Sequence, residues 1–231
     1  VLKKAPLESF NQINEDKKTP KIISGLKSGK NIALVSDAGT PLISDPGYKF
    51  IKTARENNIK VEPVPGCCAL IAAITSSGLP SDRFSFHGFL PRSSSKRITE
   101  LSALNHNKET LIFYESVHRI QSSIEDMINV FGGSRPAVLC KEITKMHESF
   151  IGDTLLDIFN FIKNNKEKIK GEFTIVIQGS SEGEVAEEEI DAILRMLMED
   201  LSLKKAVEIA AKVSNLSKSR IYDRALKIKN Q

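Results

Sequence analysis

Residues 31–47 have the sequence NIALVSDAGTPLISDPG, and their pattern is the first indication of the fold class. Its first six residues form a run of strand length that is mostly apolar, which predicts a buried strand over residues 31–36. The small residues that follow predict a tight loop, and Asp45 with Pro46 is typical of a helix cap with proline in the first turn. Strand, loop and helix in this order indicate an α/β protein.

The same alternation continues on both sides of this stretch. A short helix is expected between Thr19 and Gly29, and a second strand over residues 59–64 is followed by a helix of small residues over 67–76. After Pro80, further strands are predicted at residues 84–87, 110–114, 137–141, 149–151 and 172–178, and helices at residues 96–104, 117–131 and 154–163. The strand-rich second half favours a mixed sheet.

Changes in composition divide the chain into three expected parts. Residues 1–80 form an N-terminal α/β domain, residues 81–180 a second α/β domain with a mixed sheet, and residues 181–231 an acidic linker with a basic helical tail. This tail contains a predicted helix-turn-helix-like pair at residues 202–213 and 217–228. Its many lysines suit contact with phosphate, although a solvated helical face would explain them equally well.

Composition argues against several classes of protein. With 40% apolar and 27% charged residues, the 231-residue chain has the composition of a soluble folded protein. Its apolar runs are far shorter than the roughly 20 residues that span a bilayer, so no membrane segment is expected. The three cysteines include the adjacent pair Cys67 and Cys68, a poor start for a disulfide framework, which favours the reducing cytoplasm. Motifs for metal or nicotinamide binding are missing, so no metal is expected.

The loop after residue 36 has the chemistry of a ligand site. Its small residues let a ligand approach the backbone closely. The carboxylates of Asp37 and Asp45 could bind hydroxyls or an amine, and the end of a strand is where α/β sheets bind ligands. A tight turn with a helix cap would explain any one of these residues in isolation.

Twelve such residues in one run, at 36–47, resemble the cofactor loop of the tetrapyrrole-methylase superfamily. Further matches to that superfamily follow in the same order and spacing: VPG at 64–66, GLPSDRF at 78–84, GFLP at 88–91, TLIFYESVHR at 110–119, KEITK at 141–145, KGE at 170–172 and LKKA at 203–206. The series is most similar to the branch of methyltransferases that modify ribose in small-subunit ribosomal RNA.

This resemblance implies a two-domain tetrapyrrole-methylase-like fold with S-adenosylmethionine in the cleft between the domains and a small C-terminal helical domain. It implies methylation of the ribose 2′-hydroxyl of a cytidine in 16S ribosomal RNA, free or in the small ribosomal subunit, by a cytoplasmic homodimer. By the same resemblance, the cofactor-binding residues are Asp37, Gly39, Thr40, Pro41, Ile43, Cys68, Ala69, Tyr114, Gly171 and Glu172.

A ribose hydroxyl is weakly acidic, so its methylation benefits from a positioned base or cation. The resembling motifs make Glu115, Lys141, Glu142 and Lys145 the catalytic candidates. They also give a set of expected RNA-binding residues, namely Arg92, Lys96, Arg97, His118, Arg119, Lys204 and Lys205. Glu115 and Arg119 could instead pair with each other at a helix start, an exposed contact of about 0.3 kcal/mol.

Two alternative functions stay open. The first is a methyltransferase that acts on a small tetrapyrrole or corrin precursor, which would share the fold and the cofactor. The second is an inactive RNA-binding fragment. The family begins with a strand and a Pro-Ile-Gly-Asn loop that have no counterpart here, so the chain is expected to lack its first strands. Cys67 and Cys68 also stand where the family often has small hydroxylated residues.

Overall fold

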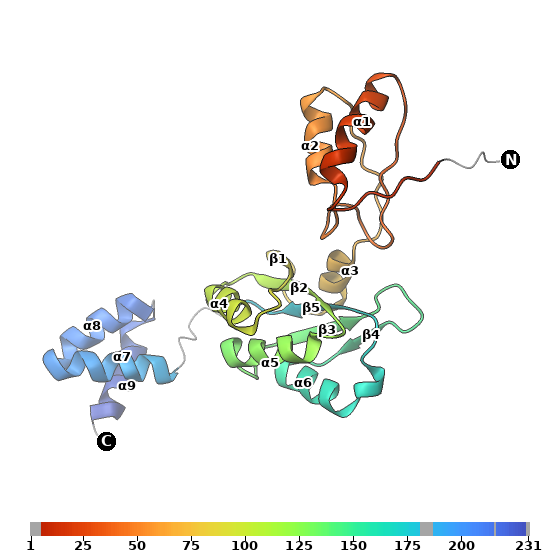
Figure 1. Ribbon diagram of the computed structural model, residues 1–231. Coiled ribbons are helices and arrows are strands. Elements are labelled where there is room, and N and C mark those ends of the chain that lie inside the picture. Colours follow the sequence, from red (N-terminus) through yellow and green to blue (C-terminus); the bar gives the residue numbers. More distant parts are fainter. Residues whose placement is uncertain (1–5, 181–186, 215, 230–231) are drawn as a thin grey trace. The chain divides into compact units, whose positions relative to one another are not determined.

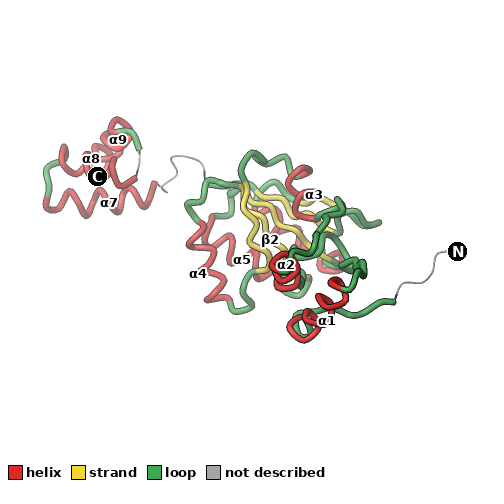
Figure 2. Tube along the Cα trace, turned by 90° about the horizontal axis from the view of Figure 1, so that it is seen from above, coloured by secondary structure: helices red, strands yellow, loops and turns green. Residues whose placement is uncertain are grey.

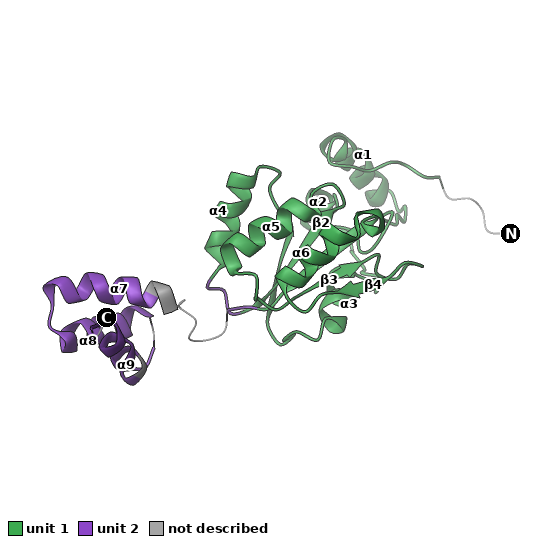
Figure 3. Ribbon diagram, turned by 90° about the horizontal axis from the view of Figure 1, so that it is seen from below, with its two compact units in different colours: residues 1–105, 109–178 green, residues 106–108, 179–231 purple. Residues whose placement is uncertain are grey.

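The computed structural model describes residues 6–180, 187–214 and 216–229 (Figure 1). They form two compact units, residues 1–105 with 109–178 and residues 106–108 with 179–231 (Figure 3). The boundary predicted between residues 80 and 81 falls inside the first unit and stays a prediction. Most of the acidic linker, residues 181–186, lies outside the described residues.

Two helices pack against each other near the start of the first unit. Helix α1, Glu15–Lys27, begins four residues before the predicted start and contains Pro20. Helix α2, Tyr48–Glu56, begins after Gly47, whose φ is 130°, so the expected cap at residues 45–46 is wrong. The two helices bury a small shared apolar cluster that contains Ile23, Phe50 and Ala54.

The strands predicted at residues 31–36 and 59–64 do not form. In the described part of the chain, neither segment has a partner with which to make a ladder of backbone hydrogen bonds. Several of their apolar side chains are exposed, including Val35 at 73% and Val64 at 91%. An apolar run favours a strand only when a neighbouring strand accepts its backbone groups, and the run itself does not supply that neighbour.

A mixed sheet forms the centre of the first unit. Within the described residues it has five strands in the order β1-β2-β5-β3-β4, with bounds Phe84–Phe89, Thr110–Ser116, Glu172–Ile177, Ala137–Lys141 and Ser149–Ile151. Strands β1 and β2 are parallel, and the other neighbours are antiparallel. The predicted mixed sheet is therefore confirmed, with β3 and β4 at their predicted bounds and β1 and β2 each two residues longer.

Helices cover both faces of this sheet (Figure 2). Alternate residues of a strand point to opposite faces, and β2 follows this rule. Leu111 and Phe113 join the core under three helices, whereas Ile112 joins the core under a fourth. The three helices are α4, Ser94–Leu104, α5, Ile120–Phe131, and α6, Leu155–Asn164, and the fourth is α3, Ala69–Ser76. A short 3-10 helix, Lys166–Lys168, precedes β5.

The second unit is helical. It contains α7, Glu187–Asp200, α8, Leu203–Ser214, and α9, Lys218–Lys229. Ile190, Leu194, Val207, Ala210, Ile221 and Ala225 form its apolar core. The predicted helix pair is confirmed within one residue at each bound. Among the described helices of the whole chain, none combines the length and apolar character needed to cross a membrane.

Candidate active site at the carboxyl edge of the sheet

The ends of several strands meet at one edge of the sheet. Strands β1, β2 and β3 run in the same direction, and β5 runs antiparallel to β2 and β3. Phe89, Ser116 and Lys141 therefore lie at the same edge as Glu172, and we call this region the carboxyl edge. In open α/β sheets, ligands bind beyond the carboxyl ends of strands. The predicted catalytic residues lie in or directly after these strand ends.

The loop of residues 36–47 is held in a tightly turned shape. The Ser36 hydroxyl donates to the carbonyl oxygen of Ala38 at 3.0 Å. Leu42 and Ser44 have φ values of 73° and 61°, a left-handed conformation that costs a residue with a side chain about 1–3 kcal/mol. Strain of this kind is concentrated at ligand sites, because a turned backbone aims its polar groups outward.

Thr40 ties this loop to the start of α3. Its hydroxyl donates to the carbonyl oxygen of Cys67 at 3.0 Å. Within the described structure, Ile43 is the one residue between 37 and 47 whose backbone amide has a hydrogen-bond acceptor, which is Thr40 O at 3.3 Å. The remaining N–H groups of the loop are thus available to a ligand.

The other predicted cofactor residues of this loop lie at or near its surface. Asp37, Gly39 and Ile43 are exposed, and Pro41 is half-buried. A Cβ added at Gly39 would meet no atom within 4 Å, so open space lies beside the backbone. No described residue forms an ion pair with the Asp37 carboxylate. A carboxylate, open amides and a bare stretch of backbone together fit a ligand that carries hydroxyl groups and a positive charge.

Tyr114 connects β2 with the start of α3. Its hydroxyl accepts a hydrogen bond from the Leu70 amide at 3.1 Å. Its ring packs edge-on against Phe86 and Phe89, with centroids 4.8 and 5.8 Å away. Burial raises the pKa of Tyr114 to about 12, so the hydroxyl stays neutral at physiological pH and serves the helix start as a hydrogen-bond acceptor.

Four of the predicted cofactor residues come together around the start of α3. Thr40 binds Cys67, Cys68 and Ala69 open the helix, and Tyr114 binds its second amide. Sequence order separates these residues by up to 74 positions (114 minus 40). Their meeting depends on the fold rather than on any local pattern.

Replacing Tyr114 by Phe is expected to change how stability responds to alkaline pH. The unfolded chain releases this proton near pH 10 and the folded protein near pH 12, so the contribution of Tyr114 is complete below pH 10 and falls as the pH rises towards 12. We expect Tyr114→Phe to lower the free energy of unfolding by about 0.5–1.5 kcal/mol at neutral pH. Urea unfolding should show that this difference shrinks between pH 10 and 12, and a constant difference would contradict the assignment.

Glu142 closes a clasp between the segment after β3 and the start of β5. Its Oε1 accepts hydrogen bonds from Lys145 Nζ and from the Glu172 amide, both at 2.8 Å. Lys145 also reaches Glu172 Oε2 at 2.8 Å, and we call these three residues the Glu142 clasp. The clasp lies against Gly171, where an added Cβ would overlap the Glu142 carboxyl.

The clasp bears on the catalytic roles predicted for Glu142 and Lys145, which stay predictions. The hydrogen bond from Lys145 lowers the pKa of Glu142, and the reciprocal bond raises the pKa of Lys145. A carboxylate whose pKa is lowered is a weaker base. Glu142 is therefore poorly suited to take a proton from a substrate, and the Lys145 ammonium is already bonded to two carboxylates.

Glu115 is likewise committed to the protein interior. Its side chain is 0% exposed. Its Oε1 accepts from the Ser116 amide and from Arg119 Nη2, both at 2.7 Å, and its Oε2 accepts from the Ser123 hydroxyl at 2.6 Å. Glu115 is thus enclosed, with both carboxyl oxygens hydrogen-bonded inside the protein, and its catalytic role stays a prediction. The alternative that it pairs with Arg119 is confirmed, but the pair is buried rather than exposed.

Lys141 has a different position. It is the last residue of β3, is half-buried, and in the described structure makes no hydrogen bond through its ammonium. It lies near enough to Glu142 to help lower the pKa of that carboxyl. Of the four catalytic candidates, Lys141 is the one whose side chain the fold leaves available at the carboxyl edge.

The predicted RNA-binding residues of the first unit divide by exposure. Arg92, Lys96 and His118 are exposed. The Arg97 side chain is 3% exposed and is paired with Asp126 at 2.6 Å. The protein encloses its guanidinium, and the role of Arg97 in RNA binding stays a prediction.

Arg119 is intermediate between these two groups. Its side chain is 21% exposed and is held by Glu115. In the second unit, Lys204 and Lys205 are exposed at the start of α8, and Lys205 lies 3.6 Å from Glu208. These lysines belong to the other compact unit, and their role in RNA binding stays a prediction.

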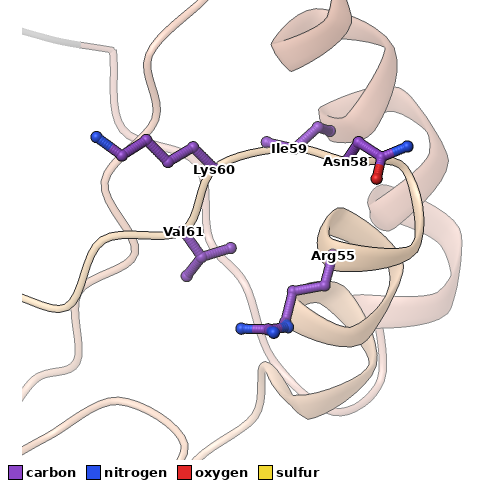
Figure 4. Close-up of a pocket in the computed structure, with 5 residues that line it drawn as sticks. All are labelled: Arg55, Asn58, Ile59, Lys60 and Val61. Carbon is purple, nitrogen blue, oxygen red and sulfur yellow. The ribbon is translucent and has the colours of Figure 1, made fainter.

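An open pocket lies at the end of α2, away from any residue predicted for function. It is lined by Arg55, Asn58, Ile59, Lys60 and Val61 (Figure 4). None of these residues belongs to the sheet or to the predicted site residues. Among the described residues there is also no cluster of three or more His, Cys, Asp and Glu side chains able to hold a metal ion.

Three polar residues that sequence reasoning missed help to organise the site. Asp126 accepts hydrogen bonds from Ser94 and from Arg97, and Ser123 binds Glu115. One signal was available for Ser123, because it lies between Ile120 and Met127 on the apolar face of a helix. A polar residue at such a position needs a buried partner.

Comparisons with known proteins define the class. The sequence profile of the Tetrapyrrole (Corrin/Porphyrin) Methylases matches residues 2–158, and that of the RsmI C-terminal HTH domain matches residues 184–229. The structure is similar in fold to the methyltransferase CobJ, with a TM-score of 0.56 at 15% identity over 76% of this chain and 78% of that chain. Uroporphyrin-III-C-methyltransferase from Thermus thermophilus has a TM-score of 0.51 at 18% identity, over 71% of each chain.

Sequence relatives narrow the class further. Ribosomal RNA small subunit methyltransferase I of Escherichia coli O157:H7 is 43% identical over 226 residues, which covers 96% of this chain and 78% of that protein. The protein of the same name in Pseudomonas aeruginosa is 42% identical over 225 residues, covering 96% and 79%. This chain belongs to the ribosomal RNA small subunit methyltransferase I family of tetrapyrrole methylases, and it is a methyltransferase. The resemblance read from the sequence is confirmed.

Proposed function

We propose that this methyltransferase transfers a methyl group from S-adenosylmethionine to the ribose 2′-hydroxyl of a cytidine in 16S ribosomal RNA, free or in the small ribosomal subunit. The observation that carries this proposal is the 43% identity to a named ribosomal RNA small subunit methyltransferase over 96% of the chain. We further propose that the enzyme acts as a homodimer in the cytoplasm.

The loop of residues 36–47 and the start of α3 are the proposed binding site of the methyl donor. S-adenosylmethionine, when bound, supplies an electrophilic methyl group on a sulfonium centre. The open backbone amides and the exposed Asp37 carboxylate offer donors and an acceptor for its hydroxyl, carboxylate and amino groups. Tyr114 contributes a neutral ring and hydroxyl to the same region. The residues present fit the group.

Lys141 is the proposed electrostatic contributor on the acceptor side. Methyl transfer forms a bond from the ribose oxygen to the methyl carbon and breaks the bond from carbon to sulfur, while the hydroxyl proton leaves to water or a base. Negative charge develops on the ribose oxygen as its proton leaves, and the new bond to the methyl carbon then takes it up. An ammonium held at the carboxyl edge stabilises that charge, and Lys141 is the candidate that the Glu142 clasp leaves available.

Arg92, Lys96 and His118 are the proposed RNA contacts of the first unit, and Lys204 and Lys205 those of the second. All five are exposed. Arginine and lysine bind phosphate oxygens through charge-assisted hydrogen bonds, which position RNA without reading its sequence. Methylation of a small tetrapyrrole has no comparable support, because the solved tetrapyrrole methyltransferases are only 15–18% identical and share the fold alone.

The test incubates the chain with S-adenosylmethionine and unmethylated small ribosomal subunits, followed by mass spectrometry of the nucleosides. We expect 2′-O-methylcytidine with the unchanged chain and a loss of about 100-fold in kcat for Lys141→Ala, as when one group that stabilises a developing oxyanion is removed. RNA binding without methylation would favour the non-catalytic alternative. Methylation of a corrin precursor with none of the RNA would overturn the proposal.

A further inference from the structure

Two arginines, Arg97 in α4 and Arg119 in the turn before α5, converge on one short loop. Residues 90–92 connect β1 with α4, and their three carbonyl oxygens accept hydrogen bonds in succession. Arg119 Nη1 donates to Leu90 O at 2.9 Å. Arg97 Nη1 donates to Pro91 O at 3.2 Å and to Arg92 O at 3.4 Å. The backbone of this loop is therefore held from the inside at each of its residues.

Arg97 is itself fixed by the buried carboxylate of Asp126. Arg97 Nε donates to Asp126 Oδ2 at 2.7 Å, and Arg97 Nη2 lies 2.6 Å from the same oxygen. The Ser94 hydroxyl donates to both Asp126 oxygens, at 3.0 and 3.1 Å. The side chains of Arg97 and Asp126 are only 3% and 10% exposed. The guanidinium therefore has little freedom to leave the loop.

Arg119 is fixed in the same way, by the buried carboxylate of Glu115. Arg119 Nη2 lies 2.7 Å from Glu115 Oε1, and Glu115 is held in turn by the Ser123 hydroxyl and the Ser116 amide. Burying charges in this manner costs desolvation, and a buried ion pair is often no more stable than an apolar replacement. Two such pairs aimed at one loop therefore point to a requirement for geometry rather than for stability alone.

The loop carries an exposed arginine at the carboxyl edge. The carbonyl of Arg92 is held by Arg97, whereas the Arg92 side chain points to no partner among the described residues and is exposed. Fixing a residue's backbone in one conformation costs conformational entropy. Because folding has already ordered the loop, RNA binding does not have to order it again. Arg92 therefore binds an RNA phosphate more tightly.

We infer that Arg97 and Arg119 are positioning residues, which hold residues 90–92 so that the Arg92 guanidinium meets an RNA phosphate at the carboxyl edge. This inference rests on the proposed function. It differs from direct RNA binding by the same two arginines, because their guanidinium groups face the loop carbonyls and the buried carboxylates. Positioning and direct RNA binding both predict weaker RNA binding when either arginine is replaced by alanine. Replacement by alanine therefore does not distinguish the two roles.

Conservative replacement separates the two versions. A guanidinium presents five donors in a fixed planar fork and can hold a carboxylate and a carbonyl together, whereas an ammonium is a point charge. A residue that contacts phosphate directly keeps much of its effect as lysine. A positioning residue loses most of its effect when it is replaced by lysine. Arg119→Lys is the better variant, because Arg119 is 21% exposed and tolerates change more readily than the enclosed Arg97.

The experiment measures the Kd for unmethylated small subunits at one fixed salt concentration, and the affinity for S-adenosylmethionine by calorimetry. We expect about 10-fold weaker RNA binding for Arg92→Ala, corresponding to one lost charged contact, and a similar loss for Arg119→Lys. The double variant should bind no more than 2-fold more weakly than Arg92→Ala, because both changes remove the same contact. The control is Arg83→Ala, an exposed arginine before the opposite end of β1, which should leave the Kd unchanged.

If Arg92 and Arg119 each contacted RNA independently, the binding measurements would give a different result. If Arg119→Lys binds like the unchanged protein, or if the double variant loses about 100-fold, the positioning role is overturned. Hydrogen exchange in the free protein separates this outcome from a failure of the proposed function. The amide of Arg97, which donates to Ser93 O at 2.9 Å and is the first hydrogen-bonded amide of α4, should exchange at least 10-fold faster in Arg119→Lys, whatever the substrate is. Unchanged exchange would overturn the inference even if ribosomal RNA proves to be the substrate.

Discussion

Asp126→Ala is expected to lower the free energy of unfolding of the first unit by about 3–5 kcal/mol, the typical cost of breaking a buried ion pair from one side. The reason is that Arg97 would keep its charge at 3% exposure with no anion beside it. Its remaining acceptors, the carbonyls of Pro91 and Arg92, do not neutralise that charge. Urea denaturation followed by circular dichroism measures the change.

A matched surface pair serves as the control for this prediction. Lys49 and Asp16 approach to 2.8 Å, close to the distance in the buried pair, but their side chains are 63% and 72% exposed. Water screens such a pair, so Asp16→Ala should change stability little. If both aspartate variants unfold at the same denaturant concentration, burial is not what makes Asp126 important. Asp126→Asn should fall between them, because it keeps an acceptor for Arg97 and loses the charge.

Gly171→Ala is expected to disrupt the Glu142 clasp and to lower methyl transfer. Gly171 has a φ of 91°, a conformation that costs a residue with a side chain about 1–3 kcal/mol. The added Cβ would also overlap the Glu142 carboxyl, which two hydrogen bonds of 2.8 Å hold in place. The start of β5 and the segment after β3 would move apart. Thermal unfolding and the ribosomal RNA methylation assay measure the two effects.

Gly133→Ala is the matched control for this substitution. Its φ is not in the left-handed region, and an added Cβ would make a contact no closer than 3.4 Å. It should change stability much less than Gly171→Ala does. A double variant with Glu142→Ala tests the overlap, because removing the carboxyl should reduce the additional cost of the alanine at 171. If Gly171→Ala, in a chain otherwise unchanged, altered neither thermal stability nor methylation, the role of the Glu142 clasp would be contradicted.

The sheet of the first unit was largely predictable because its central strands β2, β5 and β3 are buried. Strands β3 and β4 have their predicted bounds, and a contiguous apolar run such as that of β3 needs burial on both faces. The segment at residues 31–36 also has an apolar run, and that at residues 59–64 alternates apolar and charged residues up to Pro63, yet neither forms a ladder in the described structure. The difference lies in the partner strand, which a run of residues does not encode by itself.

The sequence by itself determined the family, the mixed sheet and the set of polar residues that gather near the carboxyl edge, because motif order and apolar periodicity are local properties of the chain. Only the tertiary structure decided which charged residues remain available. Glu115 and Arg97 look like surface residues in sequence and are enclosed in the fold, while Arg92 and Lys141 stay accessible. The physical reason is that the burial and pairing of a charge depend on helices and strands far away in the chain, and these decide whether it is free to act on a substrate.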